Sequence, residues 1–172
     1  MSNHFELFGL EPAYALDGAA LEQAYRDIQS KIHPDRFAHA GDAERRASMQ
    51  WTTRVNEAFR VLKDPVQRAK YLLEMKGVDV AFETNTSMPA DFLMQQLEQR
   101  EALELAAAER DAGALDRLRI MLRAERLALE AALAERIDGA RDYAAAAGLT
   151  RKLMFLGKLD AEIDAAHTEL EA

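Results

Sequence analysis

The stretch SKIHPDRFAH, residues 30–39, holds the side chains best suited to chemistry in this chain. An imidazole and a carboxylate, His33 and Asp35, flank Pro34 at the point where a helical pattern stops. Because proline disfavours helical backbone at the residue before it, we expect the His33 ring to project outward. Asp35 gains little from burial and is expected to be exposed. Proline and aspartate also suit an ordinary turn, so the tripeptide alone admits a structural or a partner-binding interpretation.

Other reactive groups are scarce in the sequence. The chain has no cysteine, which excludes disulfides, thiolate metal sites and a cysteine nucleophile. His33 and His39 lie six residues apart with no second histidine pair at ligand spacing, so we expect no metal site. No Ser-His-Asp arrangement, glycine-rich phosphate loop or paired carboxylate site stands out, so we expect neither an enzyme nor a cofactor.

The composition suits a protein with one or two small cores, since 49% of its 172 residues are hydrophobic and 30% are charged. The start, MSNHFELFGL, does not resemble a signal peptide, and no window of about 20 apolar residues predicts a membrane span. A cytoplasmic location fits these features and the lack of cysteine. The net charge of −8 lies in residues 77–172, with 11 basic and 19 acidic residues, whereas residues 1–76 hold 11 of each. An acidic back half argues against nucleic acid as a partner.

Strong helix formers dominate the sequence, which predicts an all-α protein. Residues 1–76 are predicted to form a first domain, an antiparallel helical hairpin plus short helices. One long helix runs from an N-cap at Asp17 to about residue 32, and the next runs from an N-cap at Asp42 to the residue before Pro65. Pro65 then suits the first position of a short helix that ends at Met75. The apolar face of the second long helix is predicted to consist of Met49, Thr52, Val55, Ala58, Phe59 and Leu62.

The sequence of the back half predicts a three-helix bundle at residues 89–172. Loop-forming residues at 77–88 predict a linker before it. Three long helical patterns run at about 89–111, 114–137 and 140–170. Breaks are expected at Ala112-Gly113 and Asp138-Gly139. Short connections between long helices imply antiparallel neighbours.

The first bundle helix carries apolar residues on two faces. Its core face is predicted to contain Phe92, Leu103 and Ala106, which leaves another apolar set, Leu93, Met94 and Leu97, outside the core. In the last helix, Phe155 lies about 120° from the middle of the core stripe Leu149, Leu153, Leu156 and Ile163. The four outlying residues could form one exposed apolar patch, with a polar rim of Glu98, Arg100 and Glu104. The alternative is a loose bundle in which these residues are simply core.

Several stretches in the right order resemble known families. FELFGL at 5–10, KIHPDRF at 31–37 and VNEAFRVLKDP at 55–65 resemble J domains. DPVQRAKYLL at 64–73, DFLMQQLEQREALE at 91–104 and RKLMFLGKL at 151–159 are similar to one branch, the HscB-type co-chaperones of iron–sulfur cluster assembly. The resemblance covers nearly the whole chain.

The resemblance implies a first partner, a DnaK/HscA-type chaperone whose ATP hydrolysis the tripeptide stimulates. The implied chaperone contact comprises His33, Pro34 and Asp35, with the basic residues Lys31, Arg36 and Arg26 beside them. The helix before the tripeptide departs from the basic character usual in J domains, because Arg26 and Lys31 are interleaved with Glu22, Asp27 and Ser30.

The resemblance also implies a second partner, an IscU-type iron–sulfur cluster scaffold protein. Its implied contact comprises Leu93, Met94, Leu97, Glu98 and Phe155. Two alternatives remain open: a general J-domain co-chaperone for other clients, and a small helical enzyme or metal carrier. The sequence lacks the Gly/Phe-rich segment and the cysteine-rich zinc module usual in general client-holding relatives.

Overall fold

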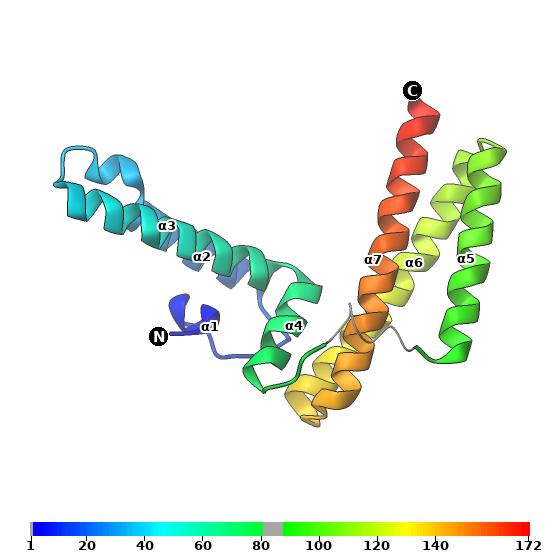
Figure 1. Ribbon diagram of the computed structural model, residues 1–172, viewed down its shortest axis with the longest axis horizontal. Coiled ribbons are helices and arrows are strands. Elements are labelled where there is room, and N and C mark those ends of the chain that lie inside the picture. The colour runs from blue at the N-terminus through cyan, green and yellow to red at the C-terminus, as the bar shows by residue number, and fades with distance from the viewer. Residues whose placement is uncertain (1, 81–87) are drawn as a thin grey trace. The chain divides into compact units, whose positions relative to one another are not determined.

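The computed structural model describes residues 2–80 and 88–172 of the chain, and all regular structure in these residues is helical. The predicted all-α class is therefore confirmed. The chain divides into two compact units, residues 1–75 and 76–172 (Figure 1). Most of the predicted linker, residues 77–88, lies outside the described residues. No helix in the described ranges is long and apolar enough for a membrane crossing.

The first unit is a helical hairpin with two short helices. Its elements are α1 (His4–Leu7), α2 (Gly18–Ile32), the 3₁₀ turn η1 (Pro34–Phe37), α3 (Asp42–Lys63) and α4 (Pro65–Met75). As predicted, the Asp17 carboxylate caps α2 by accepting the N–H groups of Ala19 and Ala20. Pro65 opens α4 as predicted. The cap predicted at Asp42 is wrong by one residue, since Gly41 is the N-cap and Asp42 is the first residue of α3.

Helices α2 and α3 lie side by side (Figure 1), and together with α1 and α4 they enclose the core of this unit. The fully buried side chains include Phe5, Leu21, Val55, Leu62 and Leu73. The predicted stripe on α3 is wrong at Met49, which is 60% exposed. At 100° per residue, Ser48 lies about 20° from the buried Val55 and Met49 about 120° from it, so Ser48 faces α2 instead.

The second unit is the predicted three-helix bundle. Its helices are α5 (Ala90–Ala108), α6 (Ala112–Ala134) and α7 (Tyr143–Glu171), and the π-helical turn η2 (Glu135–Gly139) extends the end of α6. The predicted breaks are wrong by a few residues, because Arg110 and Arg141, rather than the glycines, adopt left-handed backbone with φ of 52° and 54°. Asp111 and Asp142 then cap α6 and α7.

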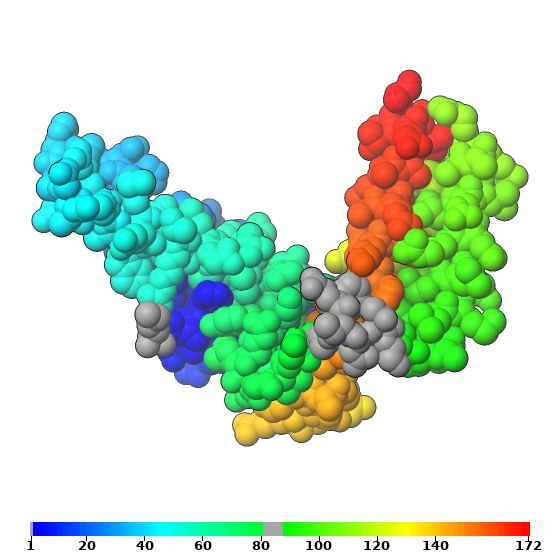
Figure 2. All heavy atoms as spheres, viewed as in Figure 1, coloured from blue at the N-terminus to red at the C-terminus, as the bar shows by residue number. Residues whose placement is uncertain are grey.

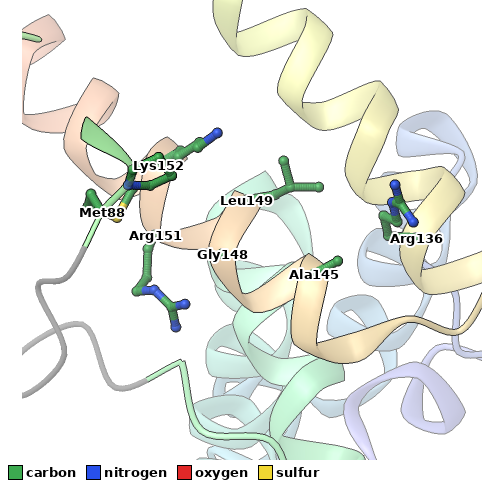
Figure 3. A pocket seen from close by; sticks show the side chains of 8 residues that line it. Met88, Arg136, Ala145, Gly148, Leu149, Arg151 and Lys152 are labelled. Atoms are coloured by element: carbon green, nitrogen blue, oxygen red, sulfur yellow. The ribbon is translucent and has the colours of Figure 1, made fainter. Parts of the chain in front are cut away.

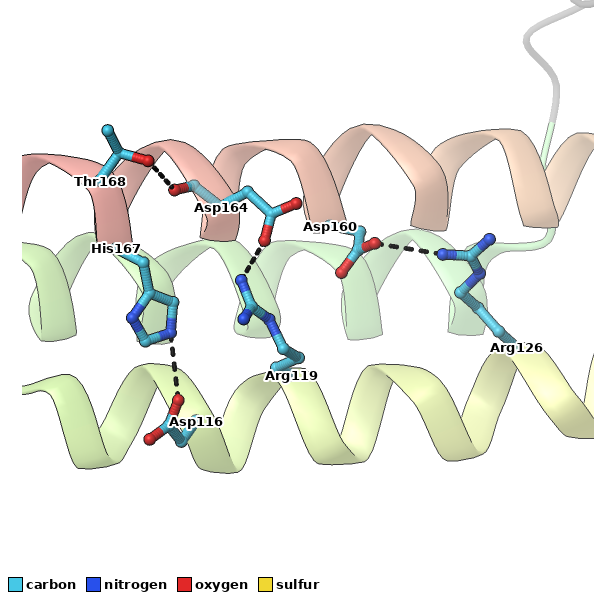
Figure 4. A network of polar contacts seen from close by, with 7 residues as sticks. All are labelled: Asp116, Arg119, Arg126, Asp160, Asp164, His167 and Thr168. Carbon is cyan, nitrogen blue, oxygen red and sulfur yellow. Dashed lines mark hydrogen bonds and ion pairs between the residues drawn. The ribbon is translucent and has the colours of Figure 1, made fainter.

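Leucines from all three helices fill the core of the bundle. Of the stripe predicted on α7, Leu153, Leu156 and Ile163 are fully buried, whereas Leu149 is only half-buried. A row of polar contacts beside this core joins α6 to α7 (Figure 4). Arg119 pairs with Asp164, the Arg126 guanidinium lies 3.2 Å from an Asp160 oxygen, and His167 Nε2 lies 3.2 Å from an Asp116 oxygen.

Candidate functional site

The tripeptide forms the start of η1 at the end of the α2–α3 hairpin, which Figure 2 shows in cyan as a narrow tip of its unit. The side chains of His33 and Asp35 are 50% and 92% exposed, which confirms their predicted exposure. The His33 ring also has a structural contact that the sequence did not predict: its Nδ1 accepts the Asp35 backbone N–H at 3.2 Å. A neutral histidine that accepts at Nδ1 carries its proton on Nε2, so Nε2 of the neutral ring is a donor.

The basic residues near the tripeptide differ in their surroundings. Arg36 folds back and donates to the Ser30 carbonyl at 2.7 Å, so its guanidinium supports the end of α2. Lys31 is exposed, next to the turn. Arg26 lies about two helical turns away and 3.9 Å from Glu22, at a weak surface pair. The structure thus brings Lys31 and Arg36 to the tripeptide and leaves Arg26 apart from it.

The apolar set on α5 lies at the surface. Leu93, Met94 and Leu97 are 45%, 62% and 57% exposed, and Glu98 beside them is exposed. Phe92 and Leu103, on the other face of the helix, are each 7% exposed. The predicted division of α5 into a core face and an outlying apolar face is therefore confirmed. We call Leu93, Met94 and Leu97 the α5 patch.

Phe155 does not lie in the open as predicted. It is partly buried against the bundle core, and its ring meets the Phe92 ring edge-on with centroids 6.2 Å apart. A helical wheel gives the direction of a side chain's first bond, but a long aromatic side chain can turn back toward the neighbouring helix. Phe155 therefore supports the first turn of α5 from within the bundle.

Sequence reasoning missed two polar residues on the core face of α5. Gln96 and Gln99 are 6% and 4% exposed, and Gln96 Nε2 donates to Gln99 Oε1 at 2.8 Å. Gln99 Nε2 in turn donates to Glu125 of α6 at 3.0 Å. The spacing 92, 96, 99, 103, 106 is one helical stripe and could have revealed them, but their polar character masked the pattern.

A pocket of about 310 Å³ near the start of α7 is lined by three basic side chains, Arg136, Arg151 and Lys152. They point away from one another (Figure 3), and each has a contact within the chain. Arg136 lies 3.4 Å from Asp142, Arg151 donates to the Val80 carbonyl at 2.9 Å, and the Lys152 ammonium lies 5.5 Å from the Phe92 ring centroid. We assign no ligand to this pocket.

Comparison with known families decides the identity of both units. Residues 3–71 match the DnaJ domain, and residues 88–164 match the HSCB C-terminal oligomerisation domain. The chain belongs to the HscB family of J-domain co-chaperones. A J domain implies an Hsp70-type chaperone as partner, and the members of this family act as co-chaperones rather than as enzymes.

Individual HscB proteins support this assignment along the whole chain. HscB homologs from Burkholderia vietnamiensis and Ralstonia nicotianae are 50% and 52% identical, and each alignment covers 98% of this chain and 96% of the relative. The chaperone HscB from Vibrio cholerae is 35% identical, with a TM-score of 0.86 over 98% of this chain and 99% of that one. Human HscB gives a TM-score of 0.90 at 23% identity, over 96% of this chain and 82% of the human one, and supports the fold alone.

Proposed function

We propose that this co-chaperone binds an iron–sulfur cluster scaffold protein through its bundle and delivers it to a DnaK/HscA-type chaperone in the cytoplasm, whose ATPase it stimulates. The observation that carries the proposal is the α5 patch, three large apolar side chains left exposed in a domain particular to this family. Contiguous exposed apolar residues on a protein surface mark sites for a partner.

At the chaperone contact, the tripeptide supplies one donor and one acceptor on a stiff turn. His33 presents its Nε2–H, and the nearly fully exposed Asp35 carboxylate can accept a charge-assisted hydrogen bond from a partner arginine. Pro34 fixes the backbone between them. Lys31 adds positive charge for an acidic chaperone surface, and Arg36 contributes by holding the turn.

At the scaffold contact, the α5 patch supplies the apolar centre and Glu98 part of a polar rim. Arg100, also expected in that rim, is paired with Glu162 of α7 at 3.0 Å, so it is tied to the bundle. Phe155 has an indirect role, because it packs behind Phe92 and thereby fixes the start of α5.

The test of the scaffold contact compares two sets of exposed apolar residues in the same bundle. Replacing Leu93, Met94 and Leu97 together with alanine is expected to weaken scaffold binding at least about 100-fold, since apolar residues central to an interface each contribute about 1–2 kcal/mol. The matched control replaces Leu105 and Ile120, which are 59% and 67% exposed outside the patch. Calorimetric titration measures affinity, and thermal melting checks that both variants stay folded.

Equal loss of scaffold affinity in the control and the patch variant would contradict the proposed contact. Undiminished affinity in the patch variant would overturn it and favour a general co-chaperone for other clients. A large fall in the melting temperature of the patch variant would place these residues in the core, contrary to their exposure.

The test of the chaperone contact uses the tripeptide. His33→Gln and Asp35→Asn are each expected to remove nearly all stimulation of the chaperone ATPase while helical content stays unchanged, because both side chains are exposed. A single-turnover ATPase assay with circular dichroism decides it. Stimulation equal to that of the parent protein would refute the contact.

A further inference from the structure

The end of α2 lacks the left-handed cap that many helices have. His33 follows the helix in extended backbone, with φ −55° and ψ 134°, as the next residue, a proline, requires. A helix that ends in this way leaves carbonyl groups of its last turn without backbone donors. Side chains supply the donors: Arg36 to the Ser30 carbonyl, the Ser48 hydroxyl to the Ile32 carbonyl at 2.6 Å, and the more distant Thr52 hydroxyl to the same oxygen at 3.5 Å.

Ser48 differs from the other hydroxyl residues of α3 in its burial and in its partner. It is 5% exposed and reaches across from α3 to the last residue of α2. The Thr52 hydroxyl donates to the Ser48 carbonyl at 2.8 Å and lies 3.5 Å from the Ile32 carbonyl. Thr53 is exposed, and its hydroxyl donates to the Met49 carbonyl of its own helix at 3.0 Å. The short bond between the two helices at this level is therefore the one from Ser48.

The Ile32 carbonyl shares a rigid peptide plane with the backbone nitrogen of His33. A bond that holds this oxygen therefore fixes the plane from which the tripeptide starts. Two further hydrogen bonds fix the backbone after this plane: the His33 carbonyl accepts the Arg36 N–H at 3.0 Å, and the His33 ring accepts the Asp35 N–H at 3.2 Å. A series of hydrogen bonds thus runs from α3 through Ile32 to Asp35.

We propose that Ser48 is a positioning residue for chaperone activation: its buried hydroxyl fixes the direction in which His33 and Asp35 face the chaperone. This inference rests on the proposed chaperone contact of the tripeptide. Ser48 itself is too buried to be a contact residue. It acts through the backbone of Ile32.

The experiment compares Ser48→Ala with Ser48→Thr, which retains the hydroxyl, and with Thr53→Ala, which removes an exposed hydroxyl from the same helix. In the full chain, Ser48→Ala is expected to raise the co-chaperone concentration for half-maximal ATPase stimulation about 5–10-fold, the effect of one hydrogen bond. Ser48→Thr is expected to restore at least half of the lost potency, and Thr53→Ala to match the parent. Circular dichroism sets a temperature at which every variant is folded.

Amide resonances of His33, Asp35, Arg36 and Phe37, observed by ¹H–¹⁵N NMR, give a second measurement, because general loss of stability would not shift them in a folded protein. They are expected to move in Ser48→Ala and to stay in place in Thr53→Ala. His33→Gln serves as the reference in the same assay. If His33→Gln abolishes stimulation while Ser48→Ala matches the parent in potency and resonances, the Ser48 proposal is overturned and the proposed function stands. If His33→Gln itself stimulates normally, the proposed chaperone contact of the tripeptide is contradicted, and the Ser48 proposal that rests on it is overturned as well.

Discussion

His33 uses its two ring nitrogens differently. Nδ1 accepts the Asp35 N–H within the turn, so the neutral ring carries its proton on Nε2. Because the same contact orders the Asp35 backbone, the donor and the acceptor offered to a chaperone are set in one small unit of structure. Such preorganisation lowers the entropy that binding must overcome.

His4 gives a prediction about pH. Burial lowers the pKa of His4 below its usual value near 6.5; Glu57 opposes this shift, and Arg54 adds to it. Below that pH, His4 binds a proton more readily in the unfolded chain than in the folded chain. The stability contributed by neutral His4 is therefore progressively lost as the pH falls below about 6.5. Folding of the first unit is therefore expected to weaken between pH 7.5 and 5.5. Urea unfolding at the two pH values measures the change.

His4→Phe is the matched control, because it can keep the ring stack on Tyr71, now at a centroid distance of 4.3 Å, but cannot titrate. The variant is expected to lose less stability than the parent over this pH interval, and other histidines cancel in the comparison. The pKa of Glu57 is lowered by its hydrogen bond to Arg60, so the stability from that carboxylate is lost only at lower pH. Identical losses in parent and variant would contradict the role of His4.

Among the helix boundaries, the starts of α2 and α4 were predicted correctly. Asp17 and Pro65 mark the starts of α2 and α4 because a carboxylate cap and a proline act locally, within the first turn. The π turn η2 and the left-handed Arg110 and Arg141 were missed, since no local residue type signals them. They depend on how the helices pack.

In the candidate site, the exposure of residues was predictable from the sequence, but the contacts of long side chains were not. The exposure of the tripeptide and of the α5 patch follows from sequence spacing alone. The inward turn of Phe155 and the fold-back of Arg36 onto the Ser30 carbonyl do not, because long side chains choose partners in three dimensions.

The ion pairs between α6 and α7 give a prediction at the scale of elements. The Arg126–Asp160 pair is about 30% exposed on both sides, whereas Asp164, the partner of Arg119, is 65% exposed. Removing the arginine of a pair leaves its carboxylate unpaired, so Arg126→Gln, which leaves the shielded Asp160 charge, is expected to cost about 1–2 kcal/mol of unfolding free energy. Arg119→Gln leaves the well-exposed Asp164 charge and is expected to cost less than about 1 kcal/mol. Urea denaturation of the two variants makes the comparison, and equal costs would show that burial does not set the strength of these pairs.

At the scale of the whole molecule, each unit has its own core and its own charge. The first unit buries Phe5, Leu21 and Leu73 and is electrically balanced, whereas the second buries leucines of three helices and carries the acidic excess. A stable core in each unit does not need residues from the other. We therefore propose that residues 1–76 and the remainder of the chain are separable domains, one for the chaperone and one for the scaffold.

The corresponding prediction divides the chain after residue 76. The fragment 1–76 is expected to fold alone, seen by circular dichroism, and to stimulate the chaperone ATPase through the tripeptide without any added effect of scaffold protein. The fragment 77–172 is expected to bind scaffold with the affinity of the full chain. Mixing the two fragments is not expected to restore scaffold-enhanced stimulation, because delivery requires a covalent link that gives the bound scaffold a high effective concentration at the chaperone. A folded fragment 1–76 without stimulation would show that the bundle itself contacts the chaperone, and recovery on mixing would show that the link is dispensable.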